Sequence, residues 1–419
     1  MTPSLAAPGR ACVATVDEIR GHFPALERRH AGRPVAYFDG PGGTQVPRAV
    51  SDAVTEYLLH HNANTHWRYP SSHETDTMLE TARETLADFL GAAPGEVAFG
   101  ANMTTLTFHL ARGLGRTWGP GDEIVVTELD HHANVAPWRA LERERGVTIR
   151  MVPIVPDTGQ LDWPALEGAL SSRTRLLAIG AASNALGTLT DVGRAAALAR
   201  AAGALSYVDA VHYAPHRLVE VRAIGCDFLA CSAYKFYGTH VGVLYGQSDR
   251  LAGVDIPKLE PAPDTAPERV ETGTLNHEGI AGAAAAVEFL ASLAPSAGSR
   301  RERLGAVFAE LEHRGLALVQ RLLDGLAAIP GVRLFGPRAA SARTPTVAFT
   351  VGERPTDEVA DALADAAVFA SNGDFYATSV VRRYGLTSRG GLVRAGCAAY
   401  TTADEVDRLL AVVDRLARS

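Results

Sequence analysis

Lysine is nearly absent from this chain of 419 residues, which contains only Lys235 and Lys258 among its forty basic residues. Acidic residues outnumber basic ones, and the net charge of -7 argues against binding to nucleic acid or to anionic membranes through a basic surface. No run of about 18 apolar residues occurs, so we expect no membrane-spanning helix. The N-terminus lacks the long apolar segment of a signal peptide, and we therefore expect a cytoplasmic protein.

Cysteine is scarce as well. The four residues, Cys12, Cys226, Cys231 and Cys397, do not have the spacing of metal ligands. Two of them lie in apolar runs, which favours small buried residues over a disulfide. The sequence therefore predicts no metal site.

The chain is long enough for two domains, and 47% of its residues are hydrophobic. Apolar runs alternate with helical patterns, which predicts an α/β fold with a mostly parallel, helix-covered sheet of seven strands. These strands are expected at 97–99, 123–127, 148–152, 175–179, 204–208, 226–231 and 241–245. A break near 295–299 precedes a long helix and further strands, which indicates a smaller α+β domain at 296–419. We assign 35–295 to the large domain and expect 1–34 to pack with the small one.

Polar residues follow several of these strands. Lys235 comes after the apolar run 226–231, where desolvation would lower the pKa of its amine and suit it to Schiff-base chemistry. Asp209, Asn184 and Thr104 also fall just past strand ends, where parallel sheets bind ligands. Taken singly, each has an ordinary explanation, such as a solvated lysine or a threonine that caps a helix.

Taken together, these residues match the requirements of pyridoxal 5'-phosphate (PLP). That cofactor needs a lysine, a carboxylate for its ring nitrogen, a flat group that stacks on the ring and a cradle for its phosphate. The candidates are Lys235, Asp209, His131 for the stacking face, Asn184 for the phenolic oxygen, and Thr104 or Thr105 for the phosphate.

Five segments, in this order, strengthen that interpretation. The first, at 128–138, reads ELDHHANVAPW and resembles E-H-H-A-N-x-x-P-W. The second and third, SNALGT at 183–188 and VDAVH at 208–212, resemble S-N-x-x-G and V-D-G-A-Q. The last two, SAYKFYG at 232–238 and ETGT at 271–274, resemble S-x-H-K-x-x-G-P and E-x-G-T. These are motifs of the class V aminotransferase family of fold-type I PLP enzymes. The chain resembles that family from about Val35 to the C-terminus, and especially its cysteine desulfurase and selenocysteine lyase branch.

The resemblance implies a role for each matching residue. Lys235 would form the Schiff base and later move the Cα proton, and Asp209 would pair with the ring nitrogen. Arg394 would bind the substrate carboxylate bidentately, although an arginine at a strand end can also form a surface ion pair. The other implied cofactor contacts are His131 on the ring, Asn184 and His212 near the ring oxygen, Thr104 or Thr105, Ser232 and Tyr234 at the phosphate, and Thr274 at the phosphate of the other subunit of a homodimer.

The departures from the family motifs bear on the reaction. Tyr234 replaces the histidine that precedes the lysine, and His212 replaces a glutamine. The segment that carries the sulfur-accepting cysteine of desulfurases, R-x-G-H-H-C, here reads SNGDFY at 371–376. A phenol cannot form a persulfide, and Cys397 lies beyond Arg394 in a predicted core strand. We therefore reject a persulfide-forming cysteine desulfurase.

The remaining prediction is a homodimeric PLP enzyme that acts on an α-amino acid. A leaving group on Cβ would be eliminated, and the resulting aminoacrylate would hydrolyse to pyruvate and ammonia, which is carbon–sulfur lyase chemistry. The substrate pocket is expected to include His66, Arg68, Asp374 and Tyr376. Tyr376 would either protonate the leaving group or only fill the space of the cysteine loop.

Two other functions stay open at this stage. Transamination or epimerisation needs only a different position of the proton donor, and one fold serves several chemistries. A binding protein that has lost the cofactor would have lost its cofactor residues, yet Lys235, Asp209, Asn184 and His131 are all present.

Overall fold

The computed structural model describes residues 13–419, so the first part of the predicted N-terminal segment, with Cys12, lies outside the described residues. A sheet of seven strands has the order β4-β12-β11-β10-β9-β5-β6. Its strands are β4 (Val97–Gly100), β12 (Gly242–Gly246), β11 (Phe228–Ser232), β10 (Leu205–Asp209), β9 (Thr174–Gly180), β5 (Glu123–Thr127) and β6 (Thr148–Val152). Only β12 is antiparallel to its neighbours. The predicted mostly parallel seven-stranded sheet is confirmed.

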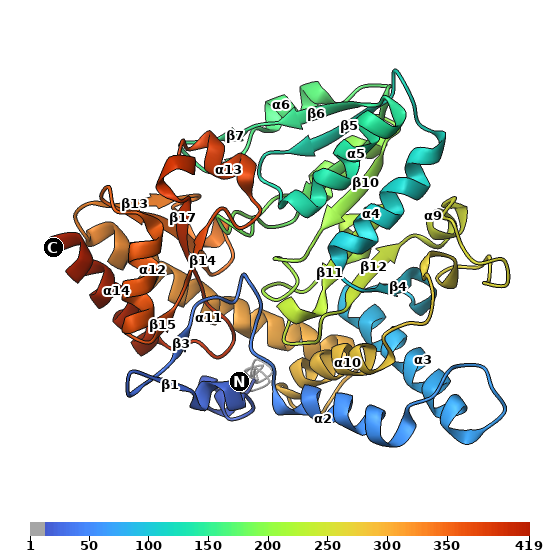
Figure 1. Ribbon diagram of the computed structural model, residues 1–419, viewed down its shortest axis with the longest axis horizontal. Helices are drawn as coiled ribbons and strands as arrows, with labels where there is room; N and C mark the ends of the chain where they lie inside the picture. Colours follow the sequence, from blue (N-terminus) through green and yellow to red (C-terminus); the bar gives the residue numbers. More distant parts are fainter. Residues whose placement is uncertain (1–12) are drawn as a thin grey trace, which may run out of the picture.

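Helices cover both faces of this sheet because its strands are apolar on both sides (Figure 1). In β9, Leu176 and Ala178 pack in one apolar cluster, whereas Leu177 and Ile179 pack in the other. Helices α4 (Met103–Leu114) and α5 (Ala136–Arg145) cover the first face, and α3 (Pro70–Leu90), α7 (Val192–Ala201) and α10 (His277–Ser292) cover the second.

A smaller antiparallel sheet follows in the order β13-β14-β17-β16. Its strands are β13 (Val332–Phe335), β14 (Thr346–Val351), β17 (Leu392–Gly396) and β16 (Ser371–Gly373). Helices α11 (Arg300–Ala328), α12 (Thr356–Asp365) and α14 (Ala403–Arg418) pack on it around a separate core. These orange and red elements form one side of the molecule in Figure 1.

The chain connects the two sheets more than once. The early strand β3 (Ala36–Tyr37) pairs with β15 (Val368–Phe369) beside the small sheet, whereas the preceding Ile19 and Phe23 are buried in the core of the large one. Helix α11 contributes its first turns to the large core and its second half to the small core. The domain limits therefore stay a prediction.

Several short elements carry no periodic signal and were missed. They include the hairpin of β7 (Ile154–Val155) and β8 (Gln160–Leu161), strand β15, and helix α13 (Thr378–Arg383). Within residues 13–419, no helix is both long enough and apolar enough to cross a membrane.

Candidate active site

The carboxyl ends of the central strands open into a cavity of about 740 Å³. Asp209 ends β10, Ser232 ends β11, and Lys235 follows in a short 3-10 turn. Strand β17 of the small sheet contributes Arg394 from the opposite wall. The predicted residues that line this cavity are Thr104, His131, Asn184, Asp209, His212, Ser232, Tyr234, Lys235, Tyr376 and Arg394.

Lys235 is buried, with 9% of its surface exposed. Its ammonium donates to the carbonyl oxygen of Pro41 and lies 4.8 Å from the centre of the Tyr234 ring. Burial, helped by the charge of Arg394, lowers the pKa of the amine to about 7, although nearby carboxylates oppose the shift. A substantial fraction of the amine is therefore neutral, and nucleophilic, at neutral pH.

Two buried carboxyl groups lie at the carboxyl ends of β10 and β5. Asp209 accepts a hydrogen bond from the N–H of Val211 at 2.9 Å, and burial raises its pKa to about 6. No cationic side chain among residues 13–419 lies within ion-pair distance of it. Asp130, which sequence reasoning missed, is held by Thr127 and Asn134, and burial raises its pKa to about 8. A protonated ring nitrogen would give Asp209 the partner that it lacks.

His131 presents a neutral ring to the cavity. Its Nδ1 accepts from the N–H of Ala133 at 3.0 Å, and burial lowers its pKa to about 4, with Lys235 and Arg394 acting in the same direction. The ring packs at 5.4 Å against that of Tyr376. This arrangement can provide the flat stacking face that the sequence predicted.

Asn184 and His212 each leave a buried polar atom without a partner among residues 13–419. Asn184 donates from Nδ2 to the carbonyl oxygen of Phe375 at 2.8 Å, while its Oδ1 has no hydrogen bond. The Nε2 of His212 lies 3.0 and 3.2 Å from the hydroxyls of Thr344 and Thr346, while its Nδ1 is unpartnered. Such atoms are costly unless a ligand satisfies them.

Arg394 is 96% removed from solvent yet has no carboxylate within ion-pair distance among residues 13–419. Its guanidinium donates to the carbonyl oxygen of Asn184 at 2.9 Å and stacks 4.0 Å above the ring of Phe375, and its Nε has no acceptor. Burial lowers its pKa to about 9, although Asp39 opposes the shift. A free guanidinium edge in a closed site is suited to the carboxylate of an amino acid.

The start of α4 gives the cavity an end rich in hydrogen-bond donors. Thr104 and Ser232 line it, and the Ser232 hydroxyl oxygen accepts from the N–H of Met103 at 3.0 Å. Thr105 does not line the cavity, because its N–H and hydroxyl both donate to Asn102, at 2.9 and 3.1 Å. Neither threonine is the helix cap, since Asn102 has that position.

The loop at 373–377 contributes Phe375 and Tyr376 to the cavity wall beside Arg394. Phe375 and Tyr376 both adopt left-handed backbone conformations, with φ of 55° and 58°. The N–H of His132 donates to the Tyr376 carbonyl at 2.7 Å, which fixes the loop. Asp374 does not line the cavity, because its two oxygens accept from Tyr376 and Thr378. Two strained residues side by side are typical of functional sites.

Three further predicted residues are not brought to the cavity by this chain. His66 is exposed and pairs with Asp76 at 3.1 Å, and Arg68 and Thr274 are exposed as well. Their assignment to a site stays a prediction, which for Thr274 involves the other subunit of a dimer.

The glycine-rich loop after β3 is part of the site, although its sequence alone indicated only a turn. Pro41 accepts the hydrogen bond from Lys235, and a Cβ atom on Gly43 would lie 3.3 Å from the ring of Tyr234. Thr44 donates twice to the carbonyl oxygen of Tyr234, at 3.1 and 3.2 Å. Close approach of the loop to the lysine segment explains the glycine.

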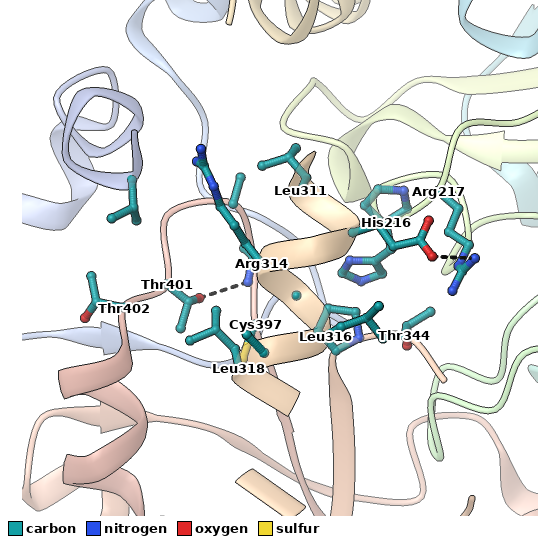
Figure 2. A pocket seen from close by; sticks show the side chains of 18 of the residues that line it. His216, Arg217, Leu311, Arg314, Leu316, Leu318, Thr344, Cys397, Thr401 and Thr402 are labelled. Carbon is teal, nitrogen blue, oxygen red and sulfur yellow. Dashed lines mark hydrogen bonds and ion pairs between the residues drawn. The ribbon is translucent and has the colours of Figure 1, made fainter. Parts of the chain in front are cut away.

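A second cavity, of about 280 Å³, lies between α11 and the segments at 215–217, 343–345 and 397–403 (Figure 2). Cys397 lines this second cavity. Cys226, Cys231 and Cys397 are all buried free thiols whose pKa burial raises, and none of them lines the cavity of Lys235.

The residues around Lys235 fit PLP. The site has a nucleophilic amine, an unpaired buried carboxyl group, a flat neutral ring, a donor-rich end and two unsatisfied polar atoms that a ligand could satisfy. No group of His, Cys, Asp or Glu within residues 13–419 is arranged to hold a metal ion.

Comparisons with known proteins agree with this geometry. A family model described as aminotransferase class-V matches residues 36–409. A cysteine desulfurase of Dickeya dadantii (strain 3937) is 34% identical, over 96% of this chain and 97% of the relative. The apo structure of a cysteine desulfurase from Thermococcus onnurineus NA1 has a TM-score of 0.86 at 29% identity, covering 96% of this chain and 98% of that one. The cysteine desulfurase CsdA from Escherichia coli has a TM-score of 0.82 at 28% identity, with the same coverage.

Proposed function

Since the chain belongs to the class V aminotransferase family and is a PLP-dependent enzyme with the fold-type I architecture, we propose that it eliminates a β-substituent from an α-amino acid. The favoured leaving group is a thiol or sulfide, released without a protein persulfide. The observation that supports this proposal is that the loop at 373–377 brings Tyr376, and none of the cysteines at 226, 231 and 397, to the wall of the cavity.

The chain's own residues divide the work between binding and proton transfer. Arg394 binds the substrate carboxylate through the N–H groups that have no acceptor within residues 13–419. The ring of Phe375 stacks on the face of the guanidinium and holds its plane in place. Lys235, whose pKa is about 7, accepts the Cα proton in its neutral form. Asp209, whose carboxyl group accepts only the N–H of Val211 among residues 13–419, would hold the protonated ring nitrogen of the cofactor. The cofactor supplies an electron sink for the charge on Cα.

Sulfur acceptance by the protein is disfavoured by the position of its thiols. The three cysteines within residues 13–419 are buried, and their raised pKa keeps them protonated. Tyr376, which is 71% exposed, has a hydroxyl that can donate a proton to a departing sulfur atom. Release of the leaving group then leaves an enamine, which hydrolyses to pyruvate and ammonia.

Transamination is the second candidate. A 2-oxo acid would present the same kind of carboxylate to Arg394, and the amine of Lys235 could accept and return the proton that transamination moves. Epimerisation is less well supported, because the ring of His131, with a pKa of about 4, is a poor base on the opposite face.

We further propose that the active unit is a homodimer. Exposed apolar side chains occur in the loop that holds His66 and Arg68, where Trp67 is 58% exposed, and in the helical turn Tyr57–His61 before it, where Leu59 is 71% exposed. A second copy that covered this surface would bring these residues, and Thr274, toward the partner's cavity. Sedimentation velocity should give the mass of a dimer, and Trp67→Ser should shift the equilibrium toward the monomer.

Product analysis tests the reaction. Purified protein with added PLP is given L-cysteine, cysteine S-conjugates, L-alanine and L-serine, each with and without a 2-oxo acid. Pyruvate together with thiol or sulfide, in the absence of reductant and 2-oxo acid, is expected. A new amino acid that forms only with a 2-oxo acid would favour transamination, and a persulfide found on any cysteine by mass spectrometry would contradict the proposal.

A matched pair of variants tests the role of Tyr376. Tyr376→Phe removes the proposed proton donor and should lower kcat most for thiols of high pKa, by about tenfold or more. Tyr384→Phe removes a hydroxyl that donates to Pro156 outside the cavity and should leave kcat unchanged. Equal kcat values for Tyr376→Phe and the wild type would show that Tyr376 only fills space.

A further inference from the structure

Beside α4, the cavity ends in groups that suit an anion. The N–H of Met103 donates to Ser232, so the hydroxyl proton of Ser232 is free to point into the cavity. The N–H of Thr104, in the first turn of the helix, has no acceptor among residues 13–419. A helix start with hydroxyl groups beside it favours phosphate.

The imidazole of His240 forms no hydrogen bond or ion pair within residues 13–419. His240 lines the cavity, and its ring stacks on that of Tyr234 with centres 4.8 Å apart and planes within 15°. The phenol ring is itself fixed, because Gly43 contacts it and Thr44 binds the Tyr234 carbonyl. The stack therefore holds the imidazole at one place on the cavity wall.

Two of the other three imidazoles of the cavity have contacts elsewhere, since the ring of His131 packs on Tyr376 and His212 lies between two threonine hydroxyls. His132 is anchored by its backbone N–H, which donates to the carbonyl oxygen of Tyr376 in the loop at 373–377. These three are buried or half-buried, whereas His240 is exposed. Among residues 13–419, Lys235 and Arg394 are the lysine and arginine that line the cavity, and Arg394 comes from the small sheet.

We propose that His240 is a phosphate-binding residue, which donates from its imidazole to the phosphate monoester of PLP while Tyr234 positions its ring. The family motif has an imidazole directly before the lysine, where this chain has Tyr234. In this chain, the ring of His240, which stacks on Tyr234, would place an imidazole at that end of the cavity, although it comes five residues after the lysine. The inference rests on the PLP dependence of the protein but not on which reaction it catalyses.

Binding of PLP and of pyridoxal, which lacks the phosphate, separates this role from a structural one. The full chain, stripped of cofactor, is titrated with each compound for the wild type and for His240→Ala. Loss of a charge-assisted hydrogen bond should weaken PLP binding by about tenfold or more and change pyridoxal binding by less than about twofold. His240→Gln, which keeps an N–H donor, should recover part of the PLP affinity.

The control is His313→Ala, which removes an exposed imidazole from α11 and should change neither affinity. Equal losses of PLP and pyridoxal affinity in His240→Ala would overturn the proposal, because they would indicate damage to the cavity as a whole. Unchanged PLP affinity would overturn it as well. A wild-type chain that bound both compounds equally would contradict phosphate recognition itself, whereas failure of the elimination assay alone would leave this result standing.

Discussion

The cavity around Lys235 and the second cavity of Figure 2 share a wall, in which the ring of His212 faces that of His216 at 5.3 Å. In the second cavity Arg217 contacts Glu312 at 2.8 Å and Arg314 contacts Glu310 at 2.9 Å, and the buried Arg343 donates to the carbonyl oxygens of Thr346, Pro337 and Leu186. In the cavity of Lys235, by contrast, buried polar atoms of Arg394, Asn184 and His212 have no partner within residues 13–419. The fold thus leaves polar and charged groups unsatisfied where a ligand can bring the partner.

The largest loss of activity is expected for Lys235→Ala, which would sharpen the contrast between the two cavities. Without the amine, the chain can neither hold PLP covalently nor move the Cα proton, so turnover should fall by about 10³-fold or more. The visible absorption of the bound cofactor should change with it. Lys258→Arg alters the other lysine, which contacts Ala262 and Asp264 outside the cavity, and should have no effect. Wild-type turnover in Lys235→Ala would refute the assignment.

The next effect concerns the unpaired guanidinium. Arg394→Gln removes the proposed carboxylate partner and should cost about 2 kcal/mol of transition-state binding, or roughly thirtyfold in kcat/KM. The lower kcat/KM should come mainly from a higher KM for the amino acid. Steady-state kinetics with an amino acid and with its decarboxylated amine checks this, because the amine should lose little. An equal loss for both compounds would mean that Arg394 only supports the fold.

A third expectation concerns pH. Burial raises the pKa of Asp130 to about 8 and that of Asp209 to about 6, above the ordinary value of 3.8. A carboxyl group with a higher pKa in the folded state binds its proton more tightly there, so folding stability falls as pH rises from about 4 to about 8. Asp130→Asn should therefore make the decline of Tm between about pH 5 and about pH 8 shallower in the cofactor-free chain.

Thermal unfolding between about pH 5 and about pH 8 measures how steeply Tm falls with pH. Asp122→Asn is the control, because a hydrogen bond from the Gly119 N–H lowers the pKa of Asp122 and its contribution is lost only at lower pH. Parallel Tm curves for Asp130→Asn and the wild type would show that this carboxyl group does not titrate in the window.

The smallest effect is expected in the second cavity. Glu312→Gln breaks the pair with Arg217, whose side chains are 35% and 25% exposed, so the free energy of unfolding should change by at most about 1 kcal/mol. Kinetic constants should stay at wild-type values. A marked loss of kcat in this variant would break the contrast between the two cavities.

The sequence predicted the large fold well because its strands are continuous apolar runs whose ends carry polar residues. Asp209, Lys235 and Asn184 were recognised because Asp209 ends such a run and the other two follow one within a few residues. The antiparallel direction of β12 could not be deduced, since it depends on which edge the strand joins.

The parts that sequence reasoning missed depend on contacts between distant segments. Pro41 and Lys235 are far apart in the chain, and only packing shows that the loop at 39–44 closes on the lysine. The stack of His240 on Tyr234 has no sequence period to reveal it. Asn102, Thr104 and Thr105 are all residue types that are favoured at a helix N-cap, so local propensity does not predict that Asn102 takes this position.

The central claim, that the chain binds PLP through the amine in the larger cavity, has a direct test because the chain has only two lysines. The protein is incubated with PLP, reduced with borohydride, digested and mapped by mass spectrometry. The account predicts a reduced pyridoxyl group on Lys235 and none on Lys258. A label on Lys258, or an unlabelled Lys235 in protein that retains the cofactor, would contradict it.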